Sequence, residues 1–151
     1  MKYLLLLSFL TFALAGCVTT RTSLPPNEAH YHFVIHHHQS RQQAFNNVEL
    51  ALAQEYNDLP RVLALKQPET GTYLLKPLVS YSMNGSGLDN DFAGYTLKIV
   101  VQNATVLVDI DLGTDEQYPG IYPPESEIPM IREKFGFLAS KVATAVGGTV
   151  Q

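Results

Sequence analysis

The sequence is poor in cysteine, tryptophan and charged residues. Its 151 residues include one Cys and no Trp, and charged residues make up 16% of the chain. A single Cys excludes a disulfide framework and any metal site built from several thiolates. The 10 Lys and Arg are outnumbered by 14 Asp and Glu, which argues against a nucleic-acid-binding protein because such a protein needs clustered basic side chains. The length supports one domain.

The first 17 residues have the pattern of a bacterial export signal. Lys2 precedes a largely apolar run, 4–14, which is shorter than the roughly 20 residues of a membrane-spanning helix. Leu14-Ala15-Gly16-Cys17 then resembles the lipobox of bacterial lipoproteins. The resemblance implies cleavage before Cys17 and attachment of a diacylglycerol to its thiolate. An ordinary signal peptide with a chance Cys is the alternative.

This signal predicts the domain boundaries and the location of the protein. Residues 1–16 are the signal peptide, 17–29 a polar tether, and 30–148 a single folded domain. Acyl chains would hold the mature protein at the membrane of the cell envelope. The residue after Cys17 is Val18 and not Asp, which resembles the pattern of lipoproteins sorted to the outer membrane. In a Gram-negative cell we therefore expect the periplasmic side of the outer membrane.

The periodicity of the remaining chain predicts the order β-α-β-β-β-β-α. Strands are expected at 31–37, 61–67, 72–82, 94–102 and 105–112, and amphipathic helices at 40–57 and 126–146. Ser40 and Gln43 form a capping-box pair, Pro77 marks an edge or a bulge, and Gly147 ends the second helix. These elements predict a two-layer α+β domain with both helices on one face of a four- or five-stranded antiparallel sheet.

The loop at 103–104 predicts a hairpin with a definite register. A two-residue loop places Val101 opposite Val106, and the pairs further along then put all the core residues on one face. The same register places Val100 opposite Leu107 on the other face, as an apolar pair on an otherwise polar surface. We therefore expect this open face to contact an envelope protein or a small apolar ligand.

Histidine is concentrated in the first predicted strand. Four histidines of equal parity should share its open face: His30, His32, His36 and His38. His37 has the other parity and should face the core. Alternate side chains lie about 7 Å apart, a spacing at which imidazoles can hold Zn²⁺ or Cu²⁺. Asp109 and Asp111 could supply oxygen ligands, or accept hydrogen bonds from those imidazoles, if their strand is adjacent. The alternative is a polar surface without metal, on which Asp109 balances Lys98.

The chain shows no constellation of catalytic residues. Its only Cys is assigned to the lipid, and the Gly-x-Gly loop at 83–91 connects two strands without the Lys of a phosphate-binding loop. Tyr118 and Tyr122 lie among prolines and would form a contact patch or cover the end of the sheet. We therefore expect a non-enzymatic protein with no cofactor, apart from the metal alternative.

Two stretches resemble a known family. Glu69-Thr70-Gly71-Thr72-Tyr73, and the strand from Tyr95 to Val101 with its hairpin, are similar to a family of uncharacterised bacterial envelope proteins with a TATA-binding-protein-like fold. The similarity covers roughly residues 31–112, and the last helix matches by order alone. It implies the fold but carries over no functional residue, because the family has no established catalytic or binding motif to match. DNA binding does not follow from the fold alone.

Overall fold

The computed structural model describes residues 26–82, 90–113 and 122–151. The predicted signal peptide, Cys17 and the first part of the tether lie outside these ranges, as do residues 83–89 of the predicted loop and Tyr118. Tyr122 is described and partly buried. None of the helices within the described ranges is long and apolar enough to cross a membrane.

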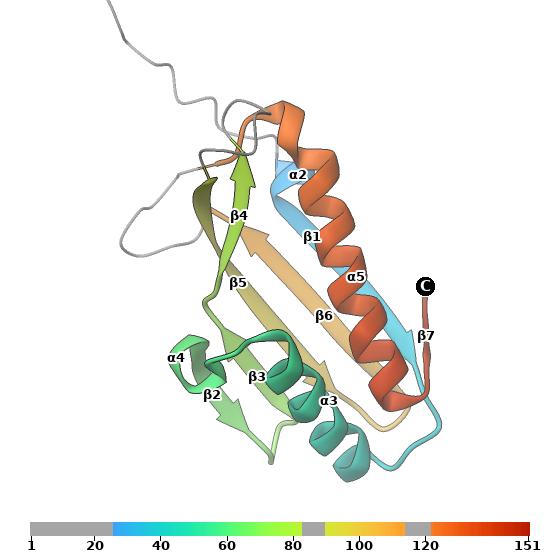
Figure 1. Cartoon of the computed structure of the whole chain (residues 1–151). Helices are drawn as coiled ribbons and strands as arrows, with labels where there is room; N and C mark the ends of the chain where they lie inside the picture. The colour runs from blue at the N-terminus through green and yellow to red at the C-terminus, as the bar shows by residue number, and fades with distance from the viewer. Residues whose placement is uncertain (1–25, 83–89, 114–121) are drawn as a thin grey trace, which may run out of the picture.

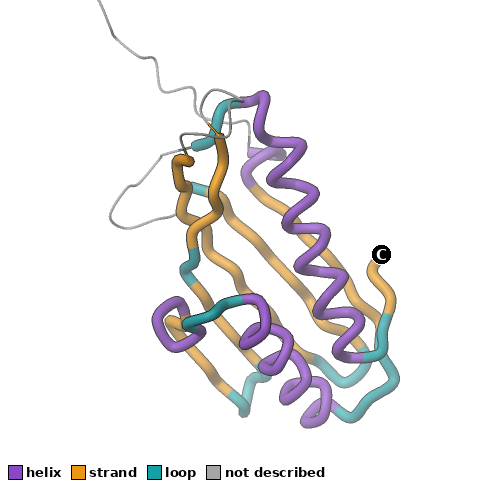
Figure 2. Tube along the Cα trace, viewed as in Figure 1, coloured by secondary structure: helices purple, strands orange, loops and turns teal. Residues whose placement is uncertain are grey.

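A layer of helices packs on one face of an antiparallel sheet (Figures 1 and 2). The strands are β1 His30–His36, β2 Leu63–Gln67, β3 Thr72–Leu75, β4 Leu78–Ser82, β5 Asn90–Val101, β6 Thr105–Leu112 and β7 Thr149–Val150. The helices are α2 Pro26–Ala29, α3 Arg41–Glu55, α4 Leu59–Val62 and α5 Ile128–Val146, with the 3-10 turn η1 Glu125–Glu127 before α5. The last four residues of the predicted tether therefore form α2.

The strand order is β2-β3-β5-β6-β1-β7, with β4 also paired to β5, and all the pairs are antiparallel. The prediction of four or five strands was wrong, because the described residues form a sheet of seven. The strand predicted at 72–82 is divided into β3 and β4. Both keep the same register against β5, but they are separated at Pro77, which has no N–H to donate. The other addition is β7, two residues long and paired with the end of β1.

The predicted hairpin register is confirmed. Val101 lies opposite Val106 and Val100 opposite Leu107, and the Gln102 amide donates to the Thr105 carbonyl at 2.8 Å. The start of β5 was wrong by four residues, since Asn90 rather than Gly94 begins it. Those first residues become a strand because β4 pairs with them.

The predicted start of α3 and the predicted end of α5 are confirmed, whereas α3 ends at Glu55, two residues early, and α5 begins at Ile128, two residues late. The backbone amide of Gln43 donates to the Ser40 hydroxyl at 3.3 Å, so Ser40 is the N-cap of α3. Gly147 ends α5 in the left-handed conformation, with φ of 62°. Sequence reasoning missed α4, because Pro60 marks the end of α3 by its position but also suits the first turn of the next helix.

The core lies between these two helices and the sheet. Its largest fully buried side chains come from the inner faces of the strands and from the apolar stripes of α3 and α5: Tyr73, Phe135, Ile35, Leu52, Leu75 and Leu97. Because α3 and α5 share this one core, the expectation of two helices on one sheet face is confirmed.

Candidate functional site

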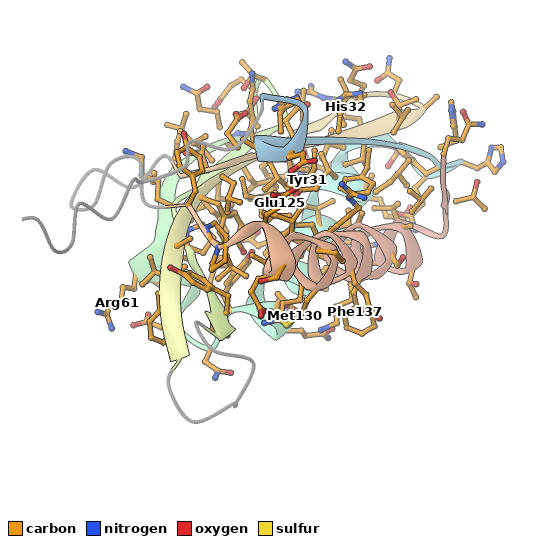
Figure 3. The ribbon with its side chains drawn as sticks, turned by 90° about the horizontal axis from the view of Figure 1, so that it is seen from above. Tyr31, His32, Arg61, Glu125, Met130 and Phe137 are labelled. Atoms are coloured by element: carbon orange, nitrogen blue, oxygen red, sulfur yellow. The ribbon has the colours of Figure 1, made fainter. Side chains whose placement is uncertain are left out.

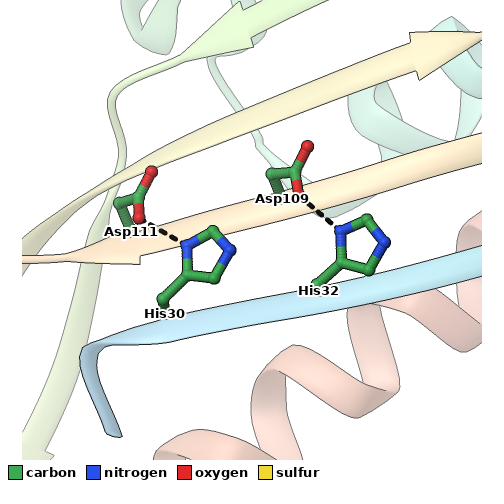
Figure 4. A network of polar contacts seen from close by, with 4 residues as sticks. All are labelled: His30, His32, Asp109 and Asp111. Carbon is green, nitrogen blue, oxygen red and sulfur yellow. Dashed lines mark hydrogen bonds and ion pairs between the residues drawn. The ribbon is translucent and has the colours of Figure 1, made fainter. Parts of the chain in front are cut away.

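Two of the three histidines of β1 lie beside aspartates of β6 on the face that α3 and α5 leave uncovered. His30 lies opposite Asp111, and His32 lies opposite Asp109. In each pair the histidine Nδ1 is 2.6 Å from the aspartate Oδ1 (Figure 4). The condition that these two strands be adjacent is therefore met, and the partner that the structure gives to Asp109 is His32.

The other histidines do not join these pairs. β1 ends at His36, so His38 lies beyond the strand and the expectation that it shares the strand's face was wrong. His36 is in β1 but lies opposite Thr105 and Thr149. His37 is buried, as its parity predicts, and both its ring nitrogens lack a hydrogen-bond partner. Within the described part of the chain, no three His, Cys, Asp or Glu side chains are grouped so as to hold a metal ion.

The predicted apolar pair on the open face belongs to a longer row. Thr72, Val100, Leu107 and Val34 lie opposite one another across β3, β5, β6 and β1. All four side chains are partly buried, which is typical of neighbours in a sheet that cover one another. Val100 and Leu107 are thus less exposed than an isolated apolar pair on a polar face would be. Their contact with a partner stays a prediction.

A cavity of about 600 Å³ lies on the opposite, helical side of the sheet, between α5, the end of α3 and β4. Its apolar walls come from β4 and α5: Leu78, Val79, Met130, Phe137 and Leu138. Figure 3 shows Met130 and Phe137 on α5, away from His32 on the other side of the sheet. Sequence reasoning missed this site, because no single segment carries its pattern.

The polar part of the cavity wall includes two tyrosine hydroxyls, together with Glu55, Ser80 and Glu133. Tyr56 Oη and Tyr95 Oη are 2.8 Å apart, and both residues line the cavity. Lys134 also lines it and reaches from α5 to β4, where its Nζ donates to the Ser80 carbonyl at 2.8 Å. The cavity therefore combines apolar walls with a few hydrogen-bonding groups.

Burial controls the ionisation of this tyrosine pair. It raises the pKa of Tyr95 to about 12. It raises the pKa of Tyr56 further, and the adjacent Tyr95 adds to the rise. Both phenols are thus held in the neutral form well above the ordinary tyrosine pKa of about 10.

We expect the folded state to lose stability above about pH 10. The unfolded chain ionises its tyrosines near pH 10, whereas the folded chain keeps Tyr95 neutral to about pH 12. The stabilisation is complete below pH 10 and is lost as pH rises through the folded pKa. Urea denaturation at several pH values should show a fall of up to about 1.4 kcal/mol per pH unit for each such tyrosine. Tyr95→Phe should make the fall shallower, and an unchanged slope would contradict the assignment.

Comparison with solved structures identifies the fold. A TBP-like protein from Parabacteroides distasonis superposes with a TM-score of 0.54 at 10% identity, over 80% of this chain and 96% of that one. The fold is TBP-like. A DUF4468 family protein from Bacteroides ovatus gives a TM-score of 0.47 at 11% identity, over 85% and 92% of the two chains. No protein-family model and no curated protein matches the sequence.

The TBP-like fold has different surfaces on its two sides in this chain. The open face of the sheet carries the His–Asp pairs and the apolar row, and it includes the residues that the sequence singled out. The helical side carries the cavity. At 10% identity the likeness shows the fold alone, so the function has to be argued from these two surfaces.

Proposed function

We propose that this TBP-like chain is a non-enzymatic lipoprotein of the cell envelope that binds a small apolar ligand in the cavity between α3, α5 and β4. The anchor rests on the lipobox-like residues that end at Cys17. The cavity supports the binding function. Its volume of about 600 Å³ falls within the range of about 300–1,000 Å³ that is typical of small-molecule sites.

The walls of the cavity suit a ligand with an apolar body. Leu78 and Phe137 stand at its exposed side, with 56% and 61% of their surfaces accessible. A ligand that covered them would remove apolar area from water, at a gain of about 25 cal/mol for each Å². The tyrosine pair and Lys134 would orient any polar end of the ligand. The sequence analysis predicted an apolar ligand on the open sheet face, whereas the cavity lies on the helical side.

The proposal is tested by placing a charge on the cavity wall. Phe137→Asp should lower the affinity for the fluorescent probe 1-anilinonaphthalene-8-sulfonate about tenfold or more, because it removes an apolar wall and adds a negative charge. Leu50→Asp is the matched control: Leu50 is equally exposed at 61% but does not line the cavity. Equal binding by the two variants, measured by fluorescence titration, would refute the cavity as the site.

The open sheet face is the surface that we propose for a protein partner of this lipoprotein. The observation in its favour is the continuous apolar row through Val34, Leu107 and Val100, on a face that neither α3 nor α5 covers. The same assay separates the two surfaces, because Leu107→Asp should leave probe binding in the cavity unchanged. Crosslinking to a partner should show the reverse: it is lost in Leu107→Asp and kept in Phe137→Asp.

A further inference from the structure

We propose that His30 and His32 form a binding site for a divalent transition-metal ion of the class that imidazole prefers, Cu²⁺ above Zn²⁺. The two residues stand side by side on the open face of β1 (Figure 4). The site is separate from the helical-side cavity and does not depend on it. It takes two of the four histidines that the sequence singled out and leaves out His36 and His38.

The aspartates define which ring nitrogen is available to the metal. Each Nδ1 lies 2.6 Å from a carboxylate oxygen, so in the neutral imidazole Nδ1 carries the proton and donates it to the aspartate. The lone pair is then on Nε2, and Figure 4 shows this second nitrogen on the side of each ring that faces away from its aspartate. Carboxylates that hold metal-binding histidines in this way fix the tautomer and make Nε2 a better donor.

The backbone sets the spacing of the two donors. His30 and His32 are alternate residues of one strand, so their Cβ atoms lie about 7 Å apart on the same face. Imidazoles at that spacing can lean toward each other and place both Nε2 atoms on one ion. About half of each histidine side chain is exposed, which gives an ion access from solvent.

The local charge favours a cation. Asp109 and Asp111 place two carboxylates within 2.6 Å of the two rings. Lys98 lies across from Asp109 on β5 and offsets part of this charge. Since the described residues offer no third protein ligand, water would fill the remaining coordination positions. Cu²⁺ binds more tightly than Zn²⁺ at such a nitrogen site.

The test is a titration of the full chain, in non-ionic detergent, with Cu²⁺ alone and with Zn²⁺ alone. The chain is made without its lipid, and all variants carry Cys17→Ser, so that no free thiol competes for the metal. We expect one Cu²⁺ per chain, with two nitrogen donors visible in its electron paramagnetic resonance spectrum. His30→Ala/His32→Ala should lose this signal, and the control His36→Ala/His38→Ala should keep it.

Substitution of an aspartate provides a second measurement. The affinity for Cu²⁺ would not change if the aspartates had only a structural role. Asp109→Asn keeps the shape of the side chain but weakens the acceptor for His32, so the affinity for Cu²⁺ should fall by about tenfold. Amide chemical shifts of the metal-free variants would show that the fold is kept. The proposal is overturned if the unsubstituted histidines bind no Cu²⁺, if both double variants bind alike, or if loss of the signal follows His36 and His38.

Discussion

Replacing Phe135 by alanine is expected to lower the free energy of unfolding by about 3–5 kcal/mol. Phe135 comes from α5 and is only 2% exposed. Its ring packs edge-on against Tyr31, with centroids 5.1 Å apart, and at a tilt against Tyr95, with centroids 4.9 Å apart. Alanine would remove these contacts and leave a void between α5 and the sheet, next to the helical-side cavity that Phe135 also lines.

Phe137 provides the control on the same helix. It lies two residues further along α5, is 61% exposed, and has the Lys141 ammonium 4.8 Å from its ring centroid. Phe137→Ala should therefore lower stability by only about 0.5–1 kcal/mol, the value of an exposed cation–π contact. Urea denaturation of both variants measures the difference. Losses of equal size would mean that α5 does not pack on the sheet through the face that contains Phe135.

The register of the β5–β6 hairpin could be predicted from the sequence because only one pairing satisfies its apolar pattern. A shift by one residue would turn Val101 and Ile99 toward solvent and bring Lys98 into the core. The helices were predictable for the same reason, since their apolar stripes match a single face. Pro77 also indicated an irregularity in its strand, because it has no N–H to donate to the hydrogen bonds of the sheet.

The cavity could not be predicted from the sequence in this way. Its walls come from the end of α3, from β4 and from α5, and no pattern within one segment reports the distance between segments. The His–Asp pairs are an intermediate case. Parity placed His30 and His32 on one face, but their pairing with Asp111 and Asp109 needed β1 to lie beside β6, which the pattern within either strand does not report. The end of β1, which separates His38 from the others, depends on tertiary packing.

Gly71→Ala is expected to lower the free energy of unfolding by about 3 kcal/mol, from left-handed backbone strain and steric overlap together. Gly71 ends the turn that begins at Pro68, with φ of 71°. A Cβ there would lie 2.4 Å from the Val101 carbonyl oxygen. That oxygen is held by the Arg41 Nε at 3.2 Å, so it cannot move away without breaking this contact between α3 and the sheet.

A second glycine is the control that separates the strain and overlap at Gly71 from the general effect of adding a methyl group. Gly136 lies inside α5, and a Cβ built there has nothing within 4 Å. Gly136→Ala should raise stability by about 0.5–1 kcal/mol, because alanine favours the helix and has less freedom to lose on folding. Urea denaturation should thus give shifts of opposite sign for the two substitutions. A harmless Gly71→Ala would mean that the turn does not press against β5, and the placement of α3 through Arg41 would then have to be revised.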